Sequence, residues 1–170
     1  MTRQMLPPAE RLRRLLRRVR RRGLRVLVLG IGNQMLGDDA VGHLLACDLA
    51  NLARGGFLAT GVGVAVENAG ALIRRHRADV VLLIDAATGI RRLPWGFVPI
   101  SRLDSFCHST HSVPLSLLVS VWKADNPALD VHFIGVTPYS NDFGSGLSPA
   151  VAAARTEIAG IFRDVLTPPE

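Results

Sequence analysis

The chain has 170 residues, of which 48% are hydrophobic and 20% are charged. This balance is typical of one compact globular domain and excludes an intrinsically disordered chain. The apolar runs are shorter than the roughly 20 residues that a membrane-spanning helix needs, and no secretory leader pattern precedes them. We therefore expect a soluble, cytoplasmic protein without a membrane span.

The formal net charge of +6 is distributed unevenly along the chain. Residues 3–25 contain ten arginines and one acid, Glu10, so this segment carries +9 and residues 26–170 carry −3. The basicity belongs to the first segment, and nucleic acid is therefore not an expected partner of the remainder. We divide the chain into a basic N-terminal arm, residues 1–24, and a single α/β domain, residues 25–170.

The arm has the pattern of an amphipathic helix. Leu12, Leu15, Leu16 and Val19 recur at helical spacing within residues 9–22, with arginines between them. We expect a helical or disordered extension that is solvated or loosely docked, in preference to a contact with a membrane surface or an acidic partner.

From residue 26 onward, short β-branched apolar runs alternate with helical patterns. Strands are predicted at residues 26–29, 62–66, 80–84 and 131–136. Helices are predicted from about residue 41, from about residue 115, and from Pro149, where Ser148 is expected to cap the free amides. The alternation predicts an α/β fold, a mostly parallel twisted sheet with helices on both faces in three α/β/α layers.

Ligands of such sheets bind beyond the carboxyl ends of the strands. The first predicted strand runs into a glycine-containing turn that ends in Asp38 and Asp39, and the third ends directly in Asp85. His111 precedes the helical pattern near residue 115. Asp38 is expected to be an ordinary helix cap. Asp39, Asp85 and His111 are expected to converge on one edge of the sheet from three loops.

Two chemistries suit this set of side chains. Two carboxylates and one imidazole can bind nickel, zinc or iron and leave coordination positions open. The same carboxylates could instead form an acid/base pair in which closeness raises one pKa. The residue types do not separate these two possibilities.

The glycine-containing turn also admits two nucleotide-binding interpretations. Gly32 and Gly37 have the Walker spacing, but an acidic pair follows where Lys-Ser/Thr would contact phosphate and magnesium. Glu67 stands where a ribose-binding acid would stand, but Met35 replaces the third glycine of a dinucleotide fingerprint. A nucleotide-binding α/β domain therefore stays an alternative.

The motifs resemble those of the nickel–iron hydrogenase maturation endopeptidases, which carry Gly-x-Gly-Asn-x-Leu/Met-x-x-Asp-Asp/Glu after a strand. The resemblance spans residues 26 to about 165, with motifs in the family's order. The matching segments are Leu29–Gly42, Ile84–Ala86, Thr110–Leu115, Ile134–Pro138 and Gly144–Val151.

The resemblance implies an endopeptidase that removes the C-terminal extension of a hydrogenase large-subunit precursor after nickel insertion. It implies that Asp39, Asp85 and His111 bind nickel carried by that substrate, without an organic cofactor. Asp39 and Asp85 are then the expected catalytic residues of an aspartic-type endopeptidase.

Gly32, Asn33 and Glu67 are expected to contact the substrate in such an enzyme. The chain departs from the family pattern at residues 67–70, where Glu-Asn-Ala-Gly replaces an acid followed by glycines and threonine. The arginine-rich arm is a second departure from the compact members. The arm leaves a further alternative, a non-catalytic hydrogenase-assembly chaperone that docks through it.

Overall fold

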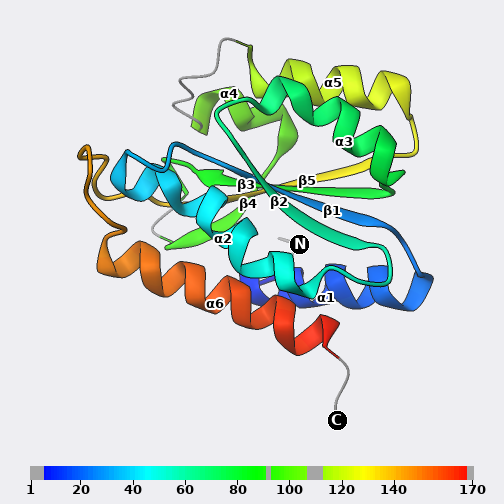
Figure 1. The fold of residues 1–170 in the computed structure, drawn as a ribbon, viewed down its shortest axis with the longest axis horizontal. Coiled ribbons are helices and arrows are strands. Elements are labelled where there is room, and N and C mark those ends of the chain that lie inside the picture. Colours follow the sequence, from blue (N-terminus) through cyan, green and yellow to red (C-terminus); the bar gives the residue numbers. More distant parts are fainter. Residues whose placement is uncertain (1–5, 91–92, 107–112, 168–170) are drawn as a thin grey trace, which may run out of the picture.

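A computed structural model describes residues 6–90, 93–106 and 113–167 of the protein (Figure 1). One five-stranded sheet has the order β2-β1-β3-β5-β4. β4 runs antiparallel to β5 at one edge, and the other neighbouring strands are parallel. The strands are β1 (Val26–Ile31), β2 (Phe57–Gly63), β3 (Val80–Ala86), β4 (Trp95–Val98) and β5 (Asp130–Val136).

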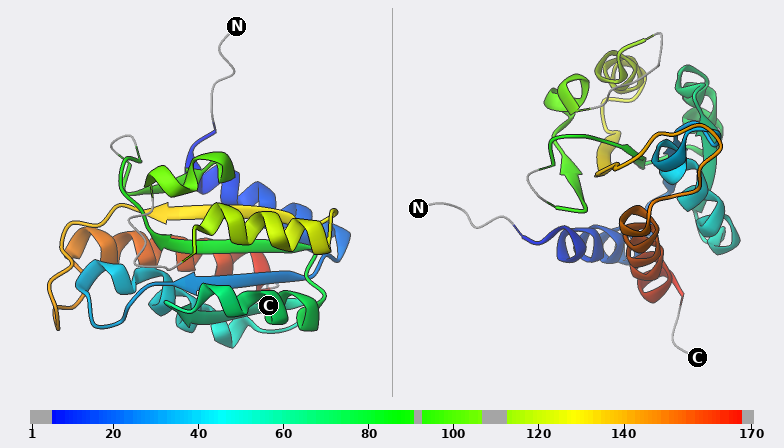
Figure 2. Two further views of the ribbon diagram at one scale, coloured as in Figure 1. Left: turned by 90° about the horizontal axis from the view of Figure 1, so that it is seen from above. Right: turned by 90° about the vertical axis from the view of Figure 1, so that its left-hand side faces the viewer.

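Helices cover both faces of this sheet, with α1, α2 and α6 on one face and α3, α4 and α5 on the other (Figures 1 and 2). None of the described helices is long and apolar enough to cross a membrane. The predicted three-layer α/β/α fold is confirmed. The helices are α1 (Pro8–Arg22), α2 (Val41–Leu49), α3 (Ala69–His76), α4 (Leu103–Phe106), α5 (Leu115–Asp125) and α6 (Pro149–Leu166).

Successive side chains of each central strand divide between two hydrophobic clusters. Val28 and Leu82 lie in the cluster with α1, α2 and α6, whereas Leu27 and Leu83 lie in the cluster with α3 and α5. Because helices bury both faces, these strands are continuous apolar runs without alternating polar residues. This explains why the runs at 26–29, 80–84 and 131–136 predicted β1, β3 and β5 correctly.

The second strand lies earlier in the chain than predicted. β2 pairs with β1 from Val26–Phe57 to Ile31–Gly63, and β1 ends there. Gly63 then adopts a φ of 59°, which turns the chain out of the sheet. The prediction of a strand at 62–66 is therefore wrong beyond residue 63, and Glu67 lies in the exposed 3₁₀ turn η3 (Val66–Asn68).

Helix α1 forms as its apolar spacing predicts, but it is firmly packed. Leu12, Leu15, Leu16 and Val19 are each at most 7% exposed and belong to the same hydrophobic cluster as α6 and the strands. Gly23, with a φ of 61°, ends the helix and returns the chain to β1. The expectation of a solvated or loosely docked extension is therefore wrong for residues 8–22.

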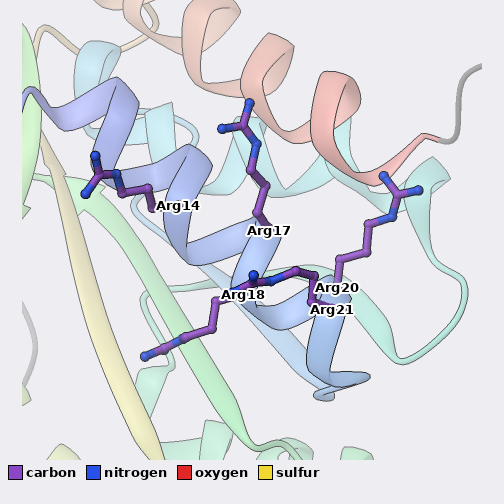
Figure 3. Close-up of a pocket in the computed structure, with 5 residues that line it drawn as sticks. All are labelled: Arg14, Arg17, Arg18, Arg20 and Arg21. Carbon is purple, nitrogen blue, oxygen red and sulfur yellow. The ribbon is translucent and has the colours of Figure 1, made fainter.

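None of the eight arginines of α1 belongs to this cluster; Arg13 and Arg18 are half-buried and the other six are exposed. Arg18 pairs with Asp130 at 2.5 Å, and Arg20 donates to the Val165 carbonyl oxygen at 3.0 Å, which fastens α1 to β5 and α6. Among the described residues, no carboxylate lies within 4.0 Å of Arg17 or Arg21. A surface hollow of about 680 Å³ is lined by Arg14, Arg17, Arg18, Arg20 and Arg21 (Figure 3).

Candidate active site

The turn from β1 into α2 brings Asp39 to the carboxyl end of β1. A Cβ at Gly32 would lie 1.7 Å from the Asp39 carbonyl oxygen, and one at Gly42 would lie 2.1 Å from the Ile84 carbonyl oxygen. Glycine at both positions is what allows this close approach. The start of α2 therefore packs directly on the ends of β1 and β3.

Backbone contacts hold the Asp39 side chain in place within this turn. The Asn33 N–H donates to Asp39 Oδ2 at 2.7 Å, and the Asp39 N–H donates to the Leu36 carbonyl oxygen at 2.9 Å. Asn33 Oδ1 in turn accepts from the Met35 N–H at 3.0 Å. Asp39 remains half-buried, so its carboxylate is oriented and still reachable from solvent.

Asp85 is the last-but-one residue of β3 and is almost completely buried, with 5% of its surface exposed. Burial raises the pKa of Asp85 well above its ordinary value, and the charge of Asp39 raises it further. The Ala86 N–H donates to Asp85 Oδ1 at 2.8 Å and offsets part of this rise in pKa. The Asp39 carboxylate is therefore close enough to affect the protonation of Asp85.

The two carboxylates flank the point where the strand order reverses. From β1 the chain passes through α2 to β2 on one side, and α3 then carries it back to β3 on the other side of β1. Asp39 follows β1 and Asp85 is the last-but-one residue of β3, so both lie at the edge where α/β sheets commonly bind their ligands. The predicted meeting of these two loops is observed.

The third predicted site residue, His111, lies outside the described residues. Within the described part of the chain, no group of three His, Cys, Asp or Glu side chains is arranged to hold a metal ion. The described donor set is therefore the two carboxylates, whose oxygens suit a divalent cation when further ligands come from elsewhere.

The three predicted substrate contacts have different positions. Gly32 is buried, and Asn33 uses its backbone and side chain to shape the turn around Asp39. Glu67 is exposed beyond the carboxyl end of β2, the edge strand next to β1. Contact with a substrate stays a prediction for all three residues.

Asp38 has a role that the sequence analysis missed. It is fully buried, and its carboxylate accepts from the Tyr139, Ser140 and Ser148 N–H groups at 2.6–3.0 Å and from Ser148 Oγ at 2.9 Å. Burial raises the pKa of Asp38, but the hydrogen bonds outweigh this effect and leave the pKa below its ordinary value. Asp38 thus fastens the segment before α6 to the site.

Two capping predictions are corrected by this arrangement. Asp38 makes no cap hydrogen bond to its own helix, because its oxygens face the segment from Tyr139 to Ser148. Ser148 occupies the N-cap position of α6, but its hydroxyl donates to Asp38 and does not cap the helix amides. Local spacing could not reveal this contact, because the two residues are 110 positions apart.

No protein-family model matches the chain, but individual known proteins are similar to it. The chain is 32% identical over 114 residues to hydrogenase 3 maturation protease of Escherichia coli K12. The aligned residues cover 66% of this chain and 72% of that protein.

Solved structures of hydrogenase maturation proteases are also similar to this chain. The [NiFe] hydrogenase maturation protease HycI from Thermococcus kodakarensis KOD1 superimposes with a TM-score of 0.74 and 26% identity, covering 85% of this chain and 94% of that chain. A crystal structure of a hydrogenase 3 maturation protease gives 0.69 and 27%, covering 81% and 88%. The endopeptidase HybD from E. coli, at 21% identity and a TM-score of 0.67, supports the fold.

Proposed function

This chain belongs to the hydrogenase maturation proteases, and on that basis we propose that it removes the C-terminal extension of a nickel–iron hydrogenase large-subunit precursor. The reaction is the hydrolysis of one peptide bond. The observation that carries the proposal is the pair formed by Asp39 and Asp85 at the reversal of the strand order.

In the proposed reaction, nickel arrives on the substrate. Asp39 and Asp85 supply two oxygen ligands to that substrate-borne metal, and His111 supplies an imidazole from the segment before α5. Docking of an incompletely coordinated metal would fix the position of one peptide bond and so make cleavage conditional on nickel insertion. The half-buried Asp39 and the buried Asp85 support this role, because both are oriented by backbone N–H groups before substrate binds.

The raised pKa of Asp85 favours a second mechanism on the same residues. A protonated Asp85 could give its proton to the departing amine nitrogen while the Asp39 carboxylate takes a proton from the attacking water. Water adds to the carbonyl carbon and the C–N bond breaks. Asp39 then releases its proton to solvent and Asp85 takes one up, which restores both groups. This acid/base pair would cleave the precursor whether or not nickel is present.

The test is cleavage of a purified large-subunit precursor that still carries its C-terminal extension, with and without nickel. Mass spectrometry should detect a released C-terminal peptide from the nickel-loaded precursor only. Asp39→Asn and Asp85→Asn should each slow release by about 100-fold or more, the range of a lost acid/base or docking group. His111→Ala should do the same.

Asp125→Asn is the matched control, because Asp125 is an exposed carboxylate at the end of α5 that pairs with Arg74. Its rate should equal that of the unsubstituted protein. If nickel-free and nickel-loaded precursor are cleaved at the same rate, nickel recognition is refuted and the acid/base mechanism is supported. Unchanged cleavage by Asp39→Asn and Asp85→Asn would refute this site.

The structure weighs against the nucleotide-binding alternative. A phosphate site in a glycine-rich turn needs backbone N–H groups that point at the ligand. In this turn six N–H groups donate within the protein: those of Gly32, Asn33, Met35, Leu36, Asp38 and Asp39. Precursor binding without any peptide release would instead support the chaperone alternative.

A further inference from the structure

Most of the exposed large hydrophobic side chains of the described residues lie at the carboxyl edge of the sheet. Eight large hydrophobic side chains are exposed in the described residues, and five of them lie beside strand ends at this edge. These five are Met35, Val64, Leu93, Tyr139 and Phe143. Tyr139 and Phe143 are the two most exposed of the eight, at 66% and 75%, and Met35 is 51% exposed.

Met35, Tyr139 and Phe143, here named the apolar rim, belong to two segments that are fastened together. Leu36 and Phe143 form an antiparallel bridge, and the Gly144 N–H donates to the Met35 carbonyl oxygen at 2.8 Å. A Cβ at Gly37 would lie 2.7 Å from the Ser140 carbonyl oxygen, so the two backbones touch. In Figure 1 the segment before α6 and the start of α2 lie at the same end of the sheet.

Asp38 adds a buried connection beneath the rim. Its carboxylate binds the Tyr139 and Ser140 N–H groups at one end of the segment and Ser148 at the other. The rim side chains are therefore exposed to solvent although their backbone is firmly held. Exposure of these apolar side chains to water is unfavourable in the isolated protein. Exposed aromatic and Met side chains on a fixed backbone are typical of protein interfaces.

The rim is continuous with the candidate active site. The Asp39 N–H donates to the Leu36 carbonyl oxygen, and Leu36 is the residue that pairs with Phe143. One short segment thus presents Met35 to solvent and positions Asp39 for chemistry. A polypeptide whose scissile bond lies at Asp39 and Asp85 must pass this edge.

We propose that the apolar rim binds apolar side chains of the hydrogenase large-subunit precursor next to the bond that is cut. This inference rests on the proposed function, which puts that precursor at Asp39 and Asp85. A polyanion does not suit the surface, because Asp39, Asp142 and Glu67 lie on the same edge. The rim acts in substrate binding and carries no chemistry.

The first measurement is steady-state cleavage of the nickel-loaded precursor by Phe143→Ser and Tyr139→Ser variants. Each should raise KM by about 10-fold, because truncation of a central aromatic contact commonly costs this much, and kcat should stay within about 2-fold. Phe143→Leu should restore most of the affinity. Thermal melts should match the unsubstituted protein, since both side chains are exposed.

Leu117→Ser and Val121→Ser are the matched controls, because these side chains are 53% and 51% exposed and belong to α5, which packs on the face of the sheet opposite to α2 and α6. Their KM should not change. Rim variants with an unchanged KM, or control variants with an equal loss, would overturn the proposal.

A second measurement separates this proposal from the peptidase function. The dissociation constant of nickel-free precursor is measured with the Asp85→Asn variant, alone and combined with Phe143→Ser or Leu117→Ser. If the double variant with Phe143→Ser binds more weakly and the double variant with Leu117→Ser does not, the proposed role of the rim is supported, even if the chain never cleaves the precursor. Equal binding in all three overturns the rim even if cleavage is observed.

Discussion

Asp38 and Asp85 are the two buried charged side chains of the described residues, and their surroundings have opposite effects. Asp38 accepts four hydrogen bonds, which lower its pKa in spite of burial. Asp85 is buried, accepts one N–H from the described residues and faces the charge of Asp39, so its pKa rises. A buried carboxylate with a full set of donors stabilises the fold, whereas one short of donors is available for binding or chemistry.

The largest expected change in stability tests the first half of this comparison. Asp38→Ala removes the acceptor of four hydrogen bonds and should lower the free energy of unfolding by about 3 kcal/mol. Denaturant unfolding monitored by circular dichroism measures this loss. Amide hydrogen exchange of Tyr139, Ser140 and Ser148 should rise sharply in the variant, and protection equal to that of the unsubstituted protein would show that Asp38 does not fasten this segment.

The stabilisation by Asp38 should also depend on pH. Because the folded pKa of Asp38 is lowered, its stabilisation is complete above the ordinary value of 3.8 and is lost as pH falls through the folded pKa. The stability difference between Asp38→Ala and the unsubstituted protein should therefore shrink in acid.

An intermediate effect of opposite sign is expected at Asp85. Asp85→Asn removes a buried carboxylate that faces the charge of Asp39 and accepts one N–H from the described residues. It should raise the free energy of unfolding by about 2 kcal/mol at neutral pH, although the proposed cleavage should slow. Because the folded pKa of Asp85 is raised, the unsubstituted protein is most favoured below 3.8 and loses stability as pH rises through the folded pKa.

The gain from Asp85→Asn should consequently grow with pH. Thermal unfolding between pH 4 and pH 8 measures it, since each kcal/mol corresponds to about 2–4 °C in Tm for a chain of this length. A variant that is less stable than the unsubstituted protein at neutral pH would show that Asp85 is satisfied by contacts beyond the Ala86 N–H.

The smallest expected effect refines the account of Asp38. Ser148→Ala removes the hydroxyl donor and leaves the Ser148 N–H bond to Asp38 intact, so the free energy of unfolding should fall by about 1 kcal/mol. Unfolding in denaturant measures the difference. Thr156→Ala on the exposed face of α6 is the control, because its hydroxyl bonds only within the helix. If Ser148→Ala loses as much unfolding free energy as Asp38→Ala, the Ser148 hydroxyl accounts for most of the stabilisation by Asp38.

Sequence patterns were sufficient for the features that depend on burial and chain order. Apolar runs identified β1, β3 and β5, and helical spacing identified α1, α2, α5 and α6. The parallel topology then placed Asp39 and Asp85 at one edge of the sheet, because the carboxyl ends of parallel strands meet there. The meeting of these two side chains follows from residues that lie next to predicted strands.

Tertiary structure decided the features that depend on a partner distant in the chain. The spacing of Leu12, Leu15, Leu16 and Val19 predicts an apolar helix face but does not reveal that α6 covers it. β4, with four residues, is too short for its period to be recognised, and β2 ends where β1 ends. Hydrophobic periodicity records that a side chain is buried and not what it is buried against.

The same limit applies to Asp38 and Asp39, the two adjacent carboxylates at the start of α2. The sequence by itself placed Asp38 and Asp39 together at the start of α2, and predicted a helix cap for Asp38 and a site residue for Asp39. Only the folded chain separates their roles, because it brings Ser148, 110 residues away, onto Asp38 and brings the end of β3 toward Asp39. Hydrogen-bond donors supplied across that distance, not local spacing, bury Asp38 and leave Asp39 as the half-buried carboxylate that solvent can reach.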